Sequence, residues 1–193
     1  MLVTVSGPPG SGKSTAAAGL AEACSLEHVS GGDLFRGLAA DRGMSLAEFG
    51  ALAESDDSID RTLDEELRTT AIEDDGLVLE SRLAGWMAGD HADLRVWLDA
   101  PIDVRARRIA KREGFGVDVA RIDTLEREAS ERRRYLEYYD IDVTDRSIYD
   151  LAINTARWDA ETVLGLLVDA VGCYDPASDE GKVPIEGVRY AFE

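Results

Sequence analysis

The most informative stretch of the chain is Gly7-Pro8-Pro9-Gly10-Ser11-Gly12-Lys13-Ser14-Thr15. It fits G-x-x-x-x-G-K-[ST] at every defined position, and it lies between an apolar run (2–6) and an alanine-rich helical stretch (14–24). Glycines let backbone N–H groups surround a phosphate because no Cβ stands in the way, and the helix N-terminus adds partial positive charge. Lys13 can reach the β- and γ-phosphates, and the Ser14 hydroxyl can ligate Mg²⁺. The stretch therefore predicts a P-loop that binds ATP, with all nine residues at the nucleotide.

Strand-like and helical segments alternate along the chain. Five short strand-like runs predict strands at 2–6, 26–30, 77–80, 95–99 and 150–154. Helical patterns separate them at 14–24, 58–74, 101–113, 118–139 and 159–171. Strands that alternate with helices are joined by crossovers and form a parallel sheet. The expected fold class is α/β, a P-loop NTPase with a five-stranded parallel sheet sandwiched by helices.

Two further stretches look inserted into this alternation. Residues 31–58 join the second strand to the next helix, and residues 112–123 form a glycine-containing bend in a charged helical region. Both are candidate moving segments.

Arginines recur where an anion-binding site needs positive charge. Arg36 follows the second strand and Arg82 follows the third. The region after the fourth strand carries Arg105, Arg107, Arg108, Arg112, Arg121, Arg127, Arg132, Arg133 and Arg134. A guanidinium group binds phosphate oxygens in pairs and stays charged. We interpret the set as an anion-binding lid; the alternative is a charged helix held by pairs such as Glu128 with Arg132.

A carboxylate marks the end of the third predicted strand. Glu80 follows the apolar residues 77–79. In P-loop proteins a carboxylate at this position holds Mg²⁺, usually through water. We therefore expect Ser14 and Glu80 to be the metal ligands, with Asp99 as a weaker alternative. The N-K-x-D motif of GTPases is absent from the sequence.

With these motifs the chain resembles the nucleoside monophosphate kinases, most closely the archaeal (type 2) cytidylate kinases. The matching residues are 7–14, 29–36, 79–86, 126–135, 139–142 and 150–155. The resemblance implies a kinase domain over 1–172, with a monophosphate-binding insert at about 31–58 and a lid at about 112–127. Residues 173–193 are expected to form an extended, surface-packed tail.

The resemblance also implies roles for single residues. The start of the insert, with Ser30, Gly32, Asp33 and Arg36, is similar to an S-T-G-D-x-x-R motif that places Arg36 on the acceptor phosphate. Arg82 would contact the same phosphate, since residues 80–82 look like the D-G-R of bacterial cytidylate kinases. Three further arginines, Arg127, Arg132 and Arg134, would belong to the lid and close on the transferring phosphoryl group. Two others, Arg108 and Arg112, would flank the adenine or the phosphates of ATP. The expected catalytic residues are thus Lys13, Arg82, Arg127, Arg132 and Arg134.

The implied reaction transfers the γ-phosphoryl group of ATP to CMP or dCMP, with Mg²⁺ as cofactor. The D-G-x-P-R of adenylate kinases is absent, which weighs against AMP as acceptor. The base-reading residues stay open, with Asp41, Arg42 and Asp57 as candidates. A kinase for adenylate, uridylate or another small molecule such as shikimate would share the same core, and a low-turnover, nucleotide-dependent assembly factor would share the P-loop.

Composition narrows the partners. The 193 residues include 39 acidic and 21 basic side chains, a net charge of −18, and lysine occurs only at 13, 111 and 182. This balance argues against nucleic-acid binding, which needs a basic surface. A uniformly acidic, lysine-poor chain resembles the cytoplasmic proteins of salt-loving archaea, in which concentrated salt screens the self-repulsion.

The remaining features predict a cytoplasmic monomer whose partners are small nucleotides. No apolar run approaches the roughly 20 residues of a membrane span, and the first residues lack a signal-peptide pattern. Cys24 and Cys173 have no metal-ligand spacing and sit in apolar helical patterns, so we expect both thiols in the core.

Overall fold

The computed structural model describes residues 1–190, apart from the side chains of residues 46 and 47. Its centre is a sheet of five parallel strands in the order β2-β3-β1-β4-β5. The strands are β1 (Leu2–Ser6), β2 (Glu27–Ser30), β3 (Leu77–Ser81), β4 (Leu94–Asp99) and β5 (Leu151–Asn154). The five predicted strands are confirmed to within one residue at each end. Because all run the same way, their carboxyl ends meet at one edge, where the P-loop lies.

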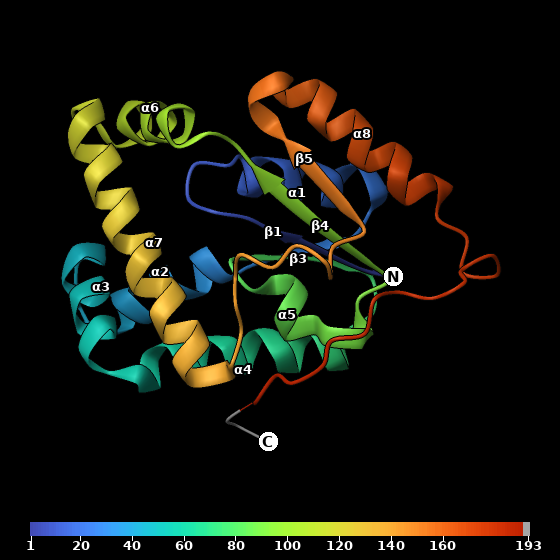
Figure 1. Ribbon diagram of the computed structural model, residues 1–193, viewed down its shortest axis with the longest axis horizontal. Coiled ribbons are helices and arrows are strands. Elements are labelled where there is room, and N and C mark those ends of the chain that lie inside the picture. The colour runs from blue at the N-terminus through green and yellow to red at the C-terminus, as the bar shows by residue number, and fades with distance from the viewer. Residues whose placement is uncertain (191–193) are drawn as a thin grey trace.

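Helices cover both faces of the sheet (Figure 1). Helices α1 (Lys13–Cys24) and α8 (Ala160–Cys173) lie on one face, over a cluster that includes Val3 and Val5. The other face carries α5 (Ala84–Ala88), part of α4 (Asp57–Glu73) and the C-terminal end of α7 (Val117–Tyr139), over a cluster that includes Leu2 and Leu79. Alternate residues of a strand point to opposite faces of the sheet. Because both faces are covered by apolar clusters here, most strands of this sheet carry apolar residues at successive positions instead of alternating between apolar and polar.

Three helices follow β2 and form a unit with its own apolar cluster. They are α2 (Gly31–Asp41), α3 (Leu46–Ser55) and α4 (Asp57–Glu73). Ala39, Phe49, Ala53 and Ile59 pack together between them. The insert expected at 31–58 thus corresponds to α2, α3 and the start of α4.

Helices α6 (Ile102–Glu113) and α7 (Val117–Tyr139) form a hairpin at the upper left of Figure 1. Gly114 ends α6 with φ of +77°, and Gly116 is the N-cap of α7, so three residues reverse the chain. The bend expected over residues 112–123 is therefore too wide. Residues 118–123 are charged but helical, because their charges lie on an exposed helix surface.

The chain ends as an extended tail. Residues 174–190 form turns and extended backbone that pass along α5 toward the end of α4 (Figure 1). The core position expected for Cys173 is wrong, because this last residue of α8 is exposed, whereas Cys24 is half-buried beside the α1–α8 cluster. Among the described residues, no helix is both long and apolar enough to cross a membrane.

Candidate active site at the P-loop

The P-loop backbone is packed too closely for side chains at Gly7 and Gly10. A Cβ at Gly7 would lie 2.1 Å from the Leu98 carbonyl oxygen, and a Cβ at Gly10, where φ is +75°, would lie 2.8 Å from the Arg105 carbonyl oxygen. Gly12 is the N-cap of α1 and leaves the first N–H groups of the helix without a side-chain cap. Uncapped N–H groups at a helix start form an anion site.

Two arginines of α6, the buried Arg105 and the half-buried Arg108, donate hydrogen bonds to P-loop carbonyls. Arg105 donates hydrogen bonds to the carbonyls of Pro9 (3.2 Å) and Ala100 (2.8 Å) and forms an ion pair with Glu128. Arg108 donates to the carbonyls of Gly10 (3.2 Å) and Ser11 (3.4 Å). Bonds that turn carbonyls away from the cradle leave its N–H groups free for phosphate.

Lys13, Glu80 and Ser30 meet at the mouth of the P-loop. Lys13 Nζ lies 3.6 Å from Glu80 Oε1, and the Ser30 hydroxyl donates to Glu80 Oε2 at 2.8 Å. Burial, and then the nearby positive charge of Arg82, lower the pKa of Lys13 to about 8. A buried ammonium group whose pKa falls in this way is short of negative charge, which a polyphosphate would supply.

Arg82 and Arg127 share one buried carboxylate. Glu131 Oε2 accepts from Arg82 Nε at 2.6 Å, and Glu131 Oε1 accepts from Arg127 Nε at 2.8 Å. The neighbouring charges of Arg82 and Arg127 outweigh burial and lower the pKa of Glu131 to about 2. Arg82 also donates to the Gly7 carbonyl at 3.4 Å. The carboxylate thus ties α7 to the P-loop through Arg82.

Sequence reasoning missed Glu131. Its signal was the four-residue spacing from Arg127, which makes two helical side chains neighbours. The same spacing favours a pair of Glu128 with Arg132, but the structure pairs Glu128 with Arg105 and Arg132 with Asp142. Arg105 was predicted only as a member of the arginine set.

Arg134 lies at a polar junction between α7 and α4. Its Nε donates to Asp60 Oδ2 at 2.7 Å. One turn along α4, the buried carboxyl group of Asp64 lies against Tyr139, and burial raises the pKa of Asp64 to about 8. Arg134 was expected at the transferring phosphoryl group, and here it links α7 to α4.

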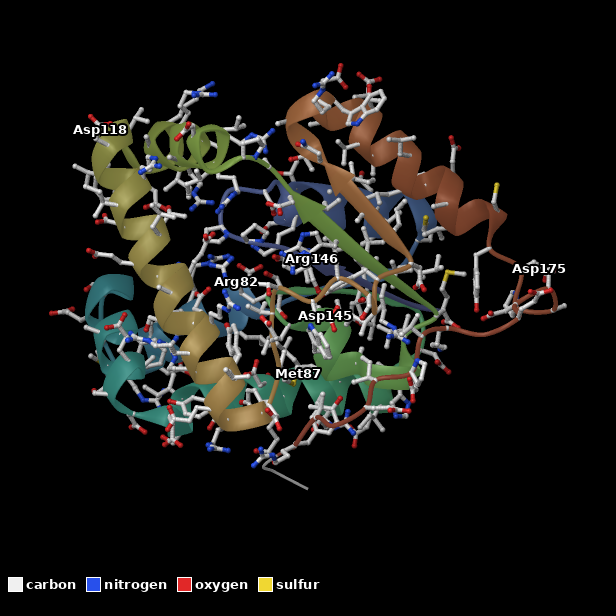
Figure 2. The ribbon with its side chains drawn as sticks, in the orientation of Figure 1. Arg82, Met87, Asp118, Asp145, Arg146 and Asp175 are labelled. Carbon is white, nitrogen blue, oxygen red and sulfur yellow. The ribbon has the colours of Figure 1, made fainter. Side chains whose placement is uncertain are left out.

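A cavity of about 690 Å³ lies under α7, beside the first half of the P-loop. Figure 2 shows Arg82 and Arg146 in the space between α7 and the sheet. The cavity is lined by acidic and basic side chains and by Trp97. The centre of the Trp97 ring lies 3.5 Å from the guanidinium carbon of Arg146. The charged lining residues are Arg82, Asp99, Arg105, Glu126, Glu128, Glu131, Arg132, Arg133 and Arg146.

Other predicted residues surround this group or lie apart from it. Ser14 and Thr15 are exposed at the start of α1, next to Lys13. Ser30 is the N-cap of α2, whose first two turns hold the residues expected at the acceptor phosphate. On these turns Arg36 forms an exposed ion pair with Asp33, next to Gly32. Arg112 is exposed and pairs with Glu113. The structure therefore gathers Lys13, Ser30, Glu80, Arg82 and Arg127. It leaves Arg36 and Arg112 facing solvent. Arg132 lines the cavity but does not contact this group, and its ion-pair partner is Asp142.

The oxygen donors of this site fit Mg²⁺ bound together with a nucleotide. Ser14 offers an exposed hydroxyl and Glu80 a carboxylate beside Lys13, and Mg²⁺ prefers such oxygen ligands together with waters and phosphates. Within residues 1–190, no three His, Cys, Asp or Glu side chains converge as a dedicated metal cage.

Comparison with known proteins agrees with this geometry. Residues 2–157 match the family described as the cytidylate kinase-like family. The chain is 61% identical over 192 residues to the cytidylate kinase of Halorubrum lacusprofundi and 60% identical to that of Halobacterium salinarum, with 100% of each chain covered. It is 47% identical over 182 residues to the cytidylate kinase of Pyrococcus horikoshii, with 94% of each chain covered. The acidic composition matches the halophilic sources of the first two.

Solved structures show the same fold at low sequence identity. The shikimate kinase of Bacteroides thetaiotaomicron superposes with a TM-score of 0.61 at 15% identity, covering 89% of this chain and 98% of its own. A gluconokinase of Sinorhizobium meliloti superposes with a TM-score of 0.58 at 16% identity, covering 88% of this chain and 90% of its own. The P-loop site, the fold and the full-length similarity agree, and the chain belongs to the cytidylate kinase-like family.

Proposed function

We propose that the protein is an ATP-dependent cytidylate kinase that transfers the γ-phosphoryl group of ATP to CMP or dCMP. The observation that carries the proposal is the convergence of Lys13, Arg82 and Arg127 beside a complete P-loop. Two anionic substrates meet in such a reaction, so their phosphates need several cations around one point. The full-length identity to cytidylate kinases supports CMP as the acceptor.

The chemical step needs no protein base. An oxygen of the acceptor phosphate, already ionised at neutral pH, attacks the γ-phosphorus, and the bond to the bridging oxygen breaks so that ADP leaves with the electron pair. The protein's part is positioning and charge stabilisation. The P-loop N–H groups would hold the ATP phosphates, and Lys13 would move from Glu80 to the γ-phosphate. Mg²⁺, held by Ser14 and through water by Glu80, would neutralise charge on the phosphates.

The acceptor would lie between β3, α7 and the insert. Arg82 is held in place by Glu131 and the Gly7 carbonyl, so its guanidinium group is oriented before substrate arrives. Arg36, exposed at the start of α2, can swing from Asp33 to the acceptor phosphate. Preorganised Arg82 and mobile Arg36 would then grip the same phosphate from two sides.

The α6–α7 hairpin would close as the lid. Its tip exposes several large apolar side chains on an otherwise acidic protein, and these are Phe115, Val117, Val119, Ile122 and Leu125. The glycines at 114 and 116 can absorb a change of backbone angle. Closure over the substrates would exclude water and so suppress hydrolysis of ATP.

The proposal is tested by product analysis. The protein is incubated in concentrated KCl with ATP, Mg²⁺ and CMP, and the nucleotides are separated by anion-exchange chromatography. We expect CDP and ADP in equal amounts, and Lys13→Ala should form them about 10²- to 10³-fold more slowly. ADP without CDP, or no ADP at all, would leave an ATP-binding protein without this transferase activity.

A further inference from the structure

The C-terminal tail is fastened to the core at several points. Side chains 182, 185, 188 and 190 are half-buried, whereas the residues between them are exposed. Lys182 Nζ donates to the carbonyls of Asp90 (2.9 Å) and Ala92 (2.6 Å), after α5. Ile185 and Val188 pack on the apolar cluster beneath α5. The tail is thus a strap with a defined inner side.

The last described residue, Tyr190, joins two helices. Its hydroxyl donates to the Trp86 carbonyl of α5 at 2.8 Å. The guanidinium group of Arg68, on α4, lies 3.6 Å from the centre of its ring. A cation over an aromatic face at this distance is attracted by the ring electrons. Tyr190 therefore fixes the end of the strap between α4 and α5.

Arg189 supplies what the C-terminus of α7 lacks. Its backbone N–H donates to the Tyr139 carbonyl at 2.9 Å, and its guanidinium group pairs with Asp140 at 2.9 Å. The last carbonyls of a helix have no partner within the helix, and a negative charge such as Asp140 is unfavourable at that end of the helix dipole. The last turn of α7 carries no basic residue of its own. The tail contributes both a donor and a cation at this helix end.

The capped C-terminal end of α7 is connected through the helix to the P-loop site. Helix α7 carries Arg127 and Glu131 near the P-loop and Arg134 against Asp60 of α4. We infer that the tail strap is the C-terminal cap of α7 and that Arg189 is a positioning residue for the acceptor side of the site. Because residues 117–139 form one continuous helix, holding its C-terminal end also holds the segment of α7 that orients Arg82. The kinetic part of this inference rests on the proposed function.

The test compares the full chain with a chain that stops at Glu186. Amide hydrogen exchange is followed in the last turn of α7 and in α1, under conditions where both proteins are folded by circular dichroism. We expect exchange at residues 136–141 to become about tenfold faster, with α1 unchanged. In the same protein the KM for CMP should rise about fivefold, while the KM for ATP changes less than twofold.

Point variants separate capping from general loosening. Arg189→Ala should raise the KM for CMP about threefold, and Arg189→Lys should recover most of it because it keeps the cation. Lys182→Met releases the strap at a point distant from α7 and should change neither exchange at 136–141 nor the KM for CMP. Unchanged exchange in the shortened chain, or equal changes for Arg189→Ala and Lys182→Met, would overturn the inference. Since exchange needs no turnover, this result stays readable even if CMP is not the acceptor.

Discussion

Replacing Glu131 with glutamine removes a buried negative charge that lies between two guanidinium groups. Arg82 and Arg127 each donate to a different oxygen of this carboxylate. Glutamine keeps the size and one carbonyl oxygen, but it leaves Arg82, whose side chain is 15% exposed, without its counter-charge. The variant therefore tests whether one carboxylate holds the two arginines in place.

The magnitude follows from the pKa of Glu131, which falls from 4.5 to about 2. A pKa depressed by about 2.5 units corresponds to about 3 kcal/mol of stability at neutral pH. The side chain of Arg127 is 61% exposed, so water screens its share and the figure is an upper value. The stabilisation is fully present above pH 4.5 and is lost as the pH falls toward 2, because the folded pKa lies below the unfolded one. For a chain of this size the melting temperature of Glu131→Gln should fall by about 6–12 °C.

The assay is thermal unfolding by circular dichroism in concentrated KCl, repeated from pH 7 to pH 3. Glu137→Gln is the matched control, because Glu137 is exposed on the same helix. We expect the control to unfold with the wild type, and the gap between Glu131→Gln and the wild type to narrow below pH 4.5. A loss under about 1 kcal/mol at pH 7, or a gap that does not change with pH, would show that Glu131 does not stabilise the fold through the two arginines.

Three further predictions concern ATP, the acceptor and salt. ATP should raise the pKa of Lys13 from about 8, so binding of ATP near pH 9 should take up close to one proton. The uptake is measured by calorimetry in buffers of different ionisation enthalpy, and Lys13→Arg should abolish it. Arg82→Ala should raise the KM for CMP at least tenfold and that for ATP less than threefold, and equal effects on both substrates would contradict its assignment to the acceptor. The melting temperature should rise between 0.1 and 1 M KCl, because the Debye length falls from about 10 to 3 Å and the salt screens the net charge of −18. A melting temperature that stays constant or falls with KCl would count against self-repulsion.

The fold could be predicted from the sequence because four of the five strands are mostly apolar and the P-loop fixes the first strand and helix. The P-loop residues and Glu80 were likewise predictable, since backbone geometry places both at the carboxyl ends of neighbouring strands. Glu131 was not, because its spacing from Arg127 is equally typical of a solvated surface pair, and only burial gives the carboxylate its role. The ion pair of Arg134 with Asp60 could not be predicted for a different reason. Its partner Asp60 lies 74 residues away, so only the packing of α7 on α4 reveals the pair.

Whether this site serves cytidylate is best measured by ADP release with a panel of acceptors. The protein is assayed in concentrated KCl with ATP, Mg²⁺ and each of CMP, dCMP, UMP, AMP, GMP and shikimate. We expect rapid release with CMP or dCMP and slow release with the others. Release that does not depend on the acceptor, or that is fastest with AMP or shikimate, would contradict the assignment of this site to cytidylate.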